Sequence, residues 1–150
     1  LGRVGGITVI DDFAHHPTAV ARTLEGLTLS FPGIRLWAVF EPASATNARD
    51  VFEERYLEAF AAAHQVVLTA VPRPDRCGDD PPFSPERLAC ALVDSGLPAC
   101  FTPQPEDVVS RLTDSLEAGD AVVFMSNSGF GGIQKLLLSA LQEKHAPPPR

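Results

Sequence analysis

Two acids and two histidines stand close together near the start of this 150-residue sequence. In the segment DDFAHHP they are Asp11, Asp12, His15 and His16, and the proline that follows suits the first turn of a helix. A carboxylate can accept hydrogen bonds from both hydroxyls of a ribose, and an imidazole can donate to a phosphate or a carboxylate. Free N–H groups at a helix start also favour anions. The segment predicts a nucleotide or anion site, with helix capping by Asp12 and His16 as the alternative.

Two further polar segments, FEPASATNAR and MSNSGFGG, each follow an apolar run. Hydroxyl side chains near a helix start are common caps, so the first of these segments alone is weak evidence for a site. The three glycines of the second allow the backbone to approach a ligand closely. Together, the two segments add these candidate site residues: Glu41, Ser44, Thr46, Asn47, Arg49, Ser126, Asn127 and Gly129.

Strand-like and helix-like segments alternate along the chain. Apolar, β-branched runs predict strands over residues 6–10, 34–40, 66–68, 99–102 and 121–125. These runs are nearly continuously apolar, which is typical of strands buried on both faces. The alternation predicts an α/β fold: a doubly wound, mainly parallel, Rossmann-like sheet of five strands, or six if the first residues pair, with helices on both faces. Ligands of such sheets bind beyond the carboxyl ends of the strands, where the three polar segments lie.

Helical spacing of apolar residues predicts which helix faces are buried. Ser84 is a good N-cap for a helix that begins at Pro85, and another helix is predicted from Glu106 to near Gly119. The residues expected on buried faces, in chain order, are Val20, Leu24, Leu27, Phe31, Phe52, Tyr56, Phe60, Ala63, Leu88, Leu92, Val93, Val109, Leu112, Leu116, Ile133, Leu136, Leu137, Ala140 and Leu141.

Composition excludes several classes of protein. The 12 Lys and Arg residues against 19 Asp and Glu give a net charge of −7, which argues against nonspecific nucleic-acid binding. The longest apolar runs are far below the roughly 20 residues that cross a bilayer, and no signal pattern is present. We therefore expect no membrane partner and a cytoplasmic location. Three cysteines without C-x-x-C spacing predict neither a disulfide framework nor a metal site.

Several nucleotide-binding motifs are missing from the sequence. A phospho-acceptor receiver domain needs an acid at the end of the third strand and a lysine after the fifth, where this chain has Leu68-Thr69-Ala70 and Ser126-Asn127-Ser128. There is no P-loop, and no GxGxxG follows the first strand. The chain cannot by itself form either phosphate cradle.

The motifs IDDFAHHPTAV, LWAVFEPxSxT and MSNSGFGGI, in this order and spacing, resemble the C-terminal domain of the Mur ligases. The resemblance spans residues 4 to 141 and is greatest to the muropeptide ligases of cell-wall recycling. The UDP-N-acetylmuramate–L-alanine ligases share the first motif more than the other two. The resemblance implies a domain over residues 1–145 that is cut from a larger enzyme at a domain boundary. Three consecutive prolines predict a disordered or extended tail at 146–150.

The resemblance also implies an activity. An N-terminal domain binds UDP-N-acetylmuramate, and a central domain carries the P-loop and most of the Mg²⁺ ligands. ATP phosphorylates the muramoyl carboxylate, and the amine of a tripeptide, or of L-alanine, attacks the acyl phosphate. Asp12, with Asp11 beside it, is implied at the ATP ribose. His15 and His16 are implied as the catalytic residues, at the junction of nucleotide and substrate. The incoming peptide is implied at Glu41, Ser44, Thr46, Arg49, Ser126, Asn127 and Gly129.

The chain departs from the usual muropeptide ligase motifs, FEPRSNT and MSNGGFGGIH, at four positions: Ala43, Ala45, Ser128 and Gln134. The lost arginine removes a fork suited to a carboxylate, a role that Arg49 is the candidate to take over. Two other functions remain open at this point. One is a free-standing nucleotide or anion-binding module without catalysis. The other is a degenerate scaffold whose site is vestigial. If it is a ligase domain, the isolated chain is expected to be inactive.

Overall fold

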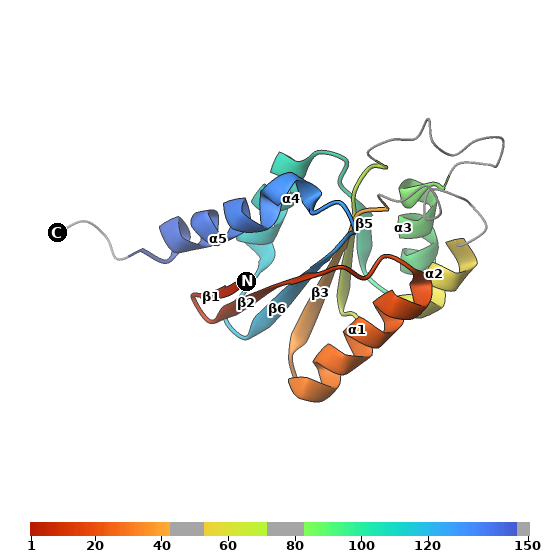
Figure 1. Ribbon diagram of the computed structural model, residues 1–150, viewed down its shortest axis with the longest axis horizontal. Coiled ribbons are helices and arrows are strands. Elements are labelled where there is room, and N and C mark those ends of the chain that lie inside the picture. The colour runs from red at the N-terminus through yellow and green to blue at the C-terminus, as the bar shows by residue number, and fades with distance from the viewer. Residues whose placement is uncertain (43–52, 72–82, 147–150) are drawn as a thin grey trace.

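A single sheet organises the computed structural model, which describes residues 1–42, 53–71 and 83–146. Within these ranges the sheet has six strands in the order β1-β2-β6-β3-β4-β5 (Figure 1). Their bounds are β1 Gly2–Val4, β2 Ile7–Asp12, β3 Arg35–Phe40, β4 Gln65–Leu68, β5 Ala99–Phe101 and β6 Asp120–Met125. Only β1 is antiparallel to its neighbour among the described strands. The prediction of a mainly parallel sheet with a sixth strand from the first residues is confirmed.

Helices cover both faces of this sheet. Helices α1 (Pro17–Ser30), α2 (Glu53–Ala59) and α3 (Pro85–Asp94) lie on one face, and α4 (Pro105–Ser115) and α5 (Ile133–Lys144) on the other (Figure 1). A short 3₁₀ turn, η3 (Phe130–Gly132), precedes α5. Each layer follows from a β-α-β connection, which places the helix against the sheet face beside its two strands.

The continuous apolar runs build two separate cores. On β6, Ala121, Val123 and Met125 face the core under α1 to α3, and Val122 and Phe124 face the core under α4 and α5. Because successive side chains of a strand point to opposite faces, only a run that is apolar at every position can fill both cores. All six residues of β6 are buried, which makes this strand the centre of the molecule.

Several predicted boundaries and faces are wrong in detail. Strand β2 continues through Asp11 and Asp12, which pair with Phe124 and Met125 of β6. Helix α4 ends at Ser115, not near Gly119, because Leu116 takes an extended conformation. The fully buried valine of α4 is Val108, whereas the predicted Val109 is half-buried and packs against the edge of the same core. Val93, Phe31 and Leu136 are 52%, 47% and 56% exposed, and Phe31 is the C-cap residue that follows α1. Phe52 lies outside the described residues.

An ion pair closes the amino end of the sheet. The Arg35 guanidinium donates to both carboxylate oxygens of Asp120, at 2.8 and 2.6 Å, and the Glu117 N–H donates to the same carboxylate at 2.9 Å. Burial alone would raise the pKa of Asp120, but the bonds from Arg35 and Glu117 outweigh it and hold the pKa below its usual value of 3.8. The pair joins the first residue of β3 to the first residue of β6.

Asp120→Asn is expected to lower the free energy of unfolding by about 1–2 kcal/mol at pH 7, a modest loss because the Arg35 side chain is 40% exposed. Since the folded-state pKa of Asp120 lies below the unfolded one, the ion pair contributes its full stability above the unfolded pKa. That contribution disappears as the pH falls through the folded pKa. Urea unfolding between pH 7 and pH 2 checks this. The two proteins should converge at the acidic end, and a constant gap would contradict the prediction.

Candidate functional site

The carboxyl ends of the central strands meet at one edge, and backbone bonds hold the loops that leave them. The Ser126 N–H donates to the Asp12 carbonyl at 3.3 Å, and the Glu41 N–H donates to the Met125 carbonyl at 3.2 Å. The ladder thus runs one residue past the strands before the loops diverge. The loops after β2, β3 and β6 therefore start side by side, as the positions of their polar residues predicted.

The Asp12 carboxylate accepts hydrogen bonds from its own loop and from the helix that follows. Its Oδ1 accepts hydrogen bonds from the Ala14 N–H at 2.7 Å and from the Thr23 hydroxyl of α1 at 3.3 Å. This Asx-type bond turns the chain from β2 into α1. The capping alternative therefore describes Asp12 in part, although the residue anchors the loop rather than the helix terminus. His16 is the N-cap residue of α1, and its side chain makes no capping bond.

Asp11 is exposed at the end of β2 and has a buried partner. The Gln134 Nε2 atom, from the first turn of α5, donates to its Oδ1 at 2.9 Å and to the Gly129 carbonyl at 3.3 Å. The Gln134 side chain therefore joins the first polar loop to the last one. Because the Asp11 carboxylate is exposed and Gln134 occupies only its Oδ1 atom, the carboxylate can accept further hydrogen bonds.

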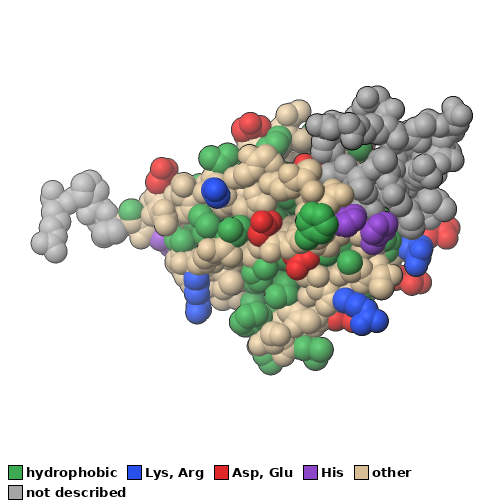
Figure 2. Space-filling view, in the orientation of Figure 1, with side chains coloured by type: hydrophobic (Ala, Val, Ile, Leu, Met, Phe, Trp, Pro, Cys, Tyr) green, Lys and Arg blue, Asp and Glu red, His purple; other side chains and the backbone are tan. Residues whose placement is uncertain are grey.

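His15 stands at the turn between β2 and α1, with its ring near those of two exposed residues. Its Nδ1 donates to the Phe13 carbonyl at 2.9 Å, so the neutral ring carries its lone pair on Nε2. The ring centroid lies 5.3 Å from that of Phe13 and 4.7 Å from that of His16. Figure 2 shows histidine side chains beside a hydrophobic side chain, with acidic side chains further along the same face.

The backbone beneath His15 is fixed by Tyr56 of α2. The buried Tyr56 hydroxyl donates to the His15 carbonyl at 2.5 Å, and burial raises the pKa of the phenol so that it stays protonated. The Tyr56 ring packs against Phe40 and Phe83 at centroid distances of 5.0 and 5.7 Å. The end of β3, helix α2 and the residue that precedes the N-cap of α3 thus support the first loop together.

Glu41 joins the loop after β3 to the loop after β6. Its Oε1 accepts a hydrogen bond from the Ser126 hydroxyl at 2.7 Å and another from the Ser128 hydroxyl. The Ser128 N–H also donates to the Ser126 hydroxyl at 2.9 Å. The carboxylate is half-buried, and the two hydroxyls offset its charge while one of its oxygens remains for other partners.

The loop after β6 ends in an unusual turn. Gly129, Phe130, Gly131 and Gly132 all have positive φ, at 81°, 54°, 61° and 84°, a conformation that residues other than Gly rarely adopt. Phe130 is held there by burial, with its ring 5.5 Å from that of Phe124. Asn127 is half-buried beside this turn. The turn is closed by a hydrogen bond from the Gly132 N–H to the Gly129 carbonyl at 3.1 Å.

The structure thus brings together most of the predicted site residues. Asp11, Asp12, His15, His16, Glu41, Ser126, Asn127 and Gly129 lie at the same edge of the sheet. Ser44, Thr46, Asn47 and Arg49 lie outside the described residues. Sequence reasoning missed the roles of Thr23, Tyr56, Ser128 and Gln134. Ser128 and Gln134 were visible only as departures from the family motif, whereas Tyr56 was expected only in the core.

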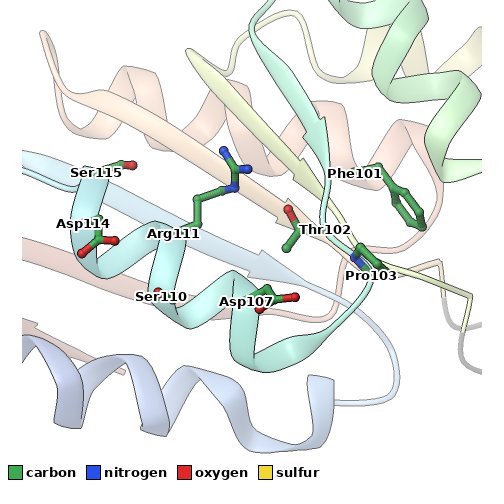
Figure 3. A pocket seen from close by; sticks show the side chains of 8 residues that line it. All are labelled: Phe101, Thr102, Pro103, Asp107, Ser110, Arg111, Asp114 and Ser115. Atoms are coloured by element: carbon green, nitrogen blue, oxygen red, sulfur yellow. The ribbon is translucent and has the colours of Figure 1, made fainter.

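Two open grooves of the described surface are lined by none of the predicted site residues. One, of about 550 Å³, runs between the end of β5 and one face of α4, where Arg111 stands between Asp107 and Asp114 (Figure 3). A second, of about 660 Å³, adjoins the amino ends of β3 and β4. In the described ranges no three His, Cys, Asp or Glu side chains gather in a way that could hold a metal ion. Nor is any helix there long and apolar enough to cross a membrane.

Comparison with known proteins agrees with this arrangement. Residues 1–128 match the family model described as "Mur ligase, glutamate ligase domain". A UDP-N-acetylmuramate–L-alanine ligase of Desulfitobacterium hafniense is 32% identical over 91% of this chain and 29% of its own length. The UDP-N-acetylmuramate–L-alanyl-γ-D-glutamyl-meso-2,6-diaminoheptandioate ligase of Escherichia coli is also 32% identical, over 95% of this chain and 29% of its own length. The chain thus spans less than a third of these curated relatives.

Solved structures give the same assignment. A murein peptide ligase from Psychrobacter arcticus matches with a TM-score of 0.78 and 29% identity, over 94% of this chain and 28% of that one. A domain from a putative UDP-N-acetylmuramate:L-alanyl-γ-D-glutamyl-diaminopimelate ligase of Haemophilus ducreyi matches with a TM-score of 0.71 and 29% identity. The match covers 93% of this chain and 95% of that one. The fold is the Rossmann-like α/β arrangement of these domains. The chain belongs to the Mur ligase family and corresponds to its C-terminal domain.

Proposed function

We propose that this chain is the C-terminal domain of a cytoplasmic, ATP-dependent ligase that joins UDP-N-acetylmuramate to a cell-wall tripeptide in peptidoglycan recycling. The observation that carries the proposal is the meeting of an exposed acid, two histidines and a hydroxyl-bound glutamate at the carboxyl edge of the sheet. The names of the relatives support the substrate class. The solved structures support the tripeptide over L-alanine, because the two at 29% identity are of that kind.

The site forms one wall of a cleft, and the other domains of the same ligase supply the other walls. Asp11 and Asp12 face the ATP ribose, while His15 and His16 line the junction of nucleotide and muramoyl group. In the reaction the γ-phosphoryl group passes from ATP to the muramoyl carboxylate and ADP leaves. The peptide amine then attacks the carbonyl carbon and phosphate leaves. When bound with ATP, Mg²⁺ offsets charge on the transferring phosphoryl group.

The incoming peptide is assigned to the other side of the edge. Glu41 can accept a hydrogen bond from an amine or ammonium group, because Ser126 and Ser128 occupy only one of its carboxylate oxygens. Asn127 and Gly129 stand beside it, and Ser44, Thr46 and Arg49 are carried over from the motif alone. The Ser128 hydroxyl donates to Glu41 at a position where the usual motif has a glycine, which has no side chain to make this hydrogen bond.

A ligation assay tests the proposal. The full-length parent enzyme is expected to form ADP and an amide product from UDP-N-acetylmuramate and the tripeptide, and only with ATP and Mg²⁺ present. The 150-residue chain alone is expected to form neither. Mass spectrometry of the product and an ADP assay check both, with L-alanine as the competing acceptor. Preference for L-alanine would assign the chain to the other kind of relative, the UDP-N-acetylmuramate–L-alanine ligases. Ligation by the isolated chain would refute the proposal.

A further inference from the structure

Gln134 is a polar residue in an apolar position. It is the second residue of α5 and only 2% exposed, on a helix whose other buried residues are Ile133, Leu137 and Leu141. Its Nε2 reaches Asp11 Oδ1 at 2.9 Å and the Gly129 carbonyl at 3.3 Å. Both acceptors fix the orientation of the amide, because the two protons of Nε2 are the only donors of this side chain.

The other half of the same amide is unsatisfied. The Gln134 Oε1 atom is buried and has no hydrogen-bond partner among the described residues. A buried acceptor without a donor costs free energy of folding, because it has lost its bonds to water. Asp11 and Gly129 are both exposed, so water could serve them if Gln134 were apolar. For stability alone, an apolar side chain of the same size would serve at least as well.

The segment that Gln134 holds is conformationally demanding. The Gly129 carbonyl accepts hydrogen bonds from Gln134 Nε2 and from the Gly132 N–H, the latter at 3.1 Å. It begins the left-handed turn from Gly129 to Gly132, in which Phe130 has a φ of 54°. Such a turn persists only where its surroundings over-determine it. The amide ties this turn to the end of β2, which lies 123 residues away from Gln134 in the sequence.

We propose that Gln134 is a positioning residue that fixes the Asp11 carboxylate and the Gly129–Gly132 turn relative to each other. This inference rests on the proposed function, in which Asp11 lies beside the nucleotide. The amide presents the open side of the carboxylate to the ribose and keeps the turn from relaxing away from it. The unsatisfied oxygen is the cost that accompanies this preorganisation, which lowers the entropy lost when the nucleotide binds.

The test is Gln134→Met in the full-length parent enzyme, because methionine keeps the length of the side chain and removes both polar atoms. The KM for ATP is expected to rise about tenfold, as for the loss of one positioning contact, while kcat and the KM for the tripeptide change less than twofold. The thermal midpoint is expected to stay equal or rise. The matched control is Gln142→Met, the same change at an exposed position of α5. It should alter neither the KM for ATP nor the thermal midpoint.

A second measurement follows the turn directly. In the 150-residue domain, amide hydrogen exchange at Gly131 and Gly132 is expected to speed up about tenfold in Gln134→Met and to stay unchanged in Gln142→Met. An active variant with the wild-type KM for ATP would overturn the role of Gln134 alone, as would unchanged exchange in the turn. A wild-type parent that does not ligate would overturn the proposed function and, with it, the assignment to the nucleotide.

Discussion

Phe124→Ala is expected to destabilise the domain by about 3–5 kcal/mol, because the substitution removes a large aromatic side chain from a closely packed core. Phe124 is the fully buried last but one residue of β6, in the core under α4 and α5. Its removal leaves a cavity beside Val39, its register partner on β3, and Phe130, because the strands and helices around this core can close in only partly. Urea unfolding of the 150-residue domain measures the loss as a shift of the midpoint at constant slope.

Phe124→Ala should also loosen the Gly129–Gly132 turn at the predicted site. The Phe130 ring packs edge-on against Phe124 with centroids 5.5 Å apart, and this contact holds Phe130 at its positive φ. Amide exchange in the turn should therefore increase more than the loss of global stability alone predicts. The control is Leu29→Ala, at an 81% exposed position, with an expected change below about 0.5 kcal/mol. A loss below about 1 kcal/mol for Phe124→Ala would contradict the packing described.

The sheet could be predicted because its signals are local. Every residue of β6 is apolar except its first, Asp120. A run of this kind indicates a strand that is buried on both faces rather than exposed to solvent on one. Ser84 and Pro85 mark the start of α3 by side-chain chemistry alone, and the Ser84 hydroxyl accepts the Arg87 N–H at 3.1 Å as expected of an N-cap. Such features depend on residues within one turn or one strand of each other.

The order of the strands was not available from such signals. Glu41 and Ser126 are 85 residues apart, and they meet because β6 lies between β2 and β3. Periodicity shows that both residues follow strands, but not which strands are neighbours. The same limit hid the bond from Gln134 to Asp11, since a glutamine at the start of an amphipathic helix is expected to be solvated. Long-range pairs of polar side chains therefore had to come from the structure.

His15→Ala in the full-length parent enzyme is expected to lower kcat/KM for ligation about 100-fold, at the lower end of the range for loss of a proton-transfer group. The Nδ1 bond to the Phe13 carbonyl leaves the Nε2 lone pair of the neutral ring able to accept a proton or a hydrogen bond. The variant loses the ring but keeps the backbone carbonyl that the Tyr56 hydroxyl binds. The first loop therefore keeps its main support, and the loss is one of chemistry rather than of folding. Steady-state kinetics with ATP, UDP-N-acetylmuramate and the tripeptide measures it.

His145→Ala is the matched control, because His145 is exposed at the far end of α5, away from the carboxyl edge of the sheet. It should leave kcat/KM within twofold of wild type, and both variants should unfold within about 0.5 kcal/mol of wild type. A His15→Ala enzyme with wild-type kcat/KM would remove His15 from the reaction. If activity fell only in step with stability, His15 would be a structural residue, and the acid, the hydroxyls and the backbone of this edge would have to account for the chemistry without it.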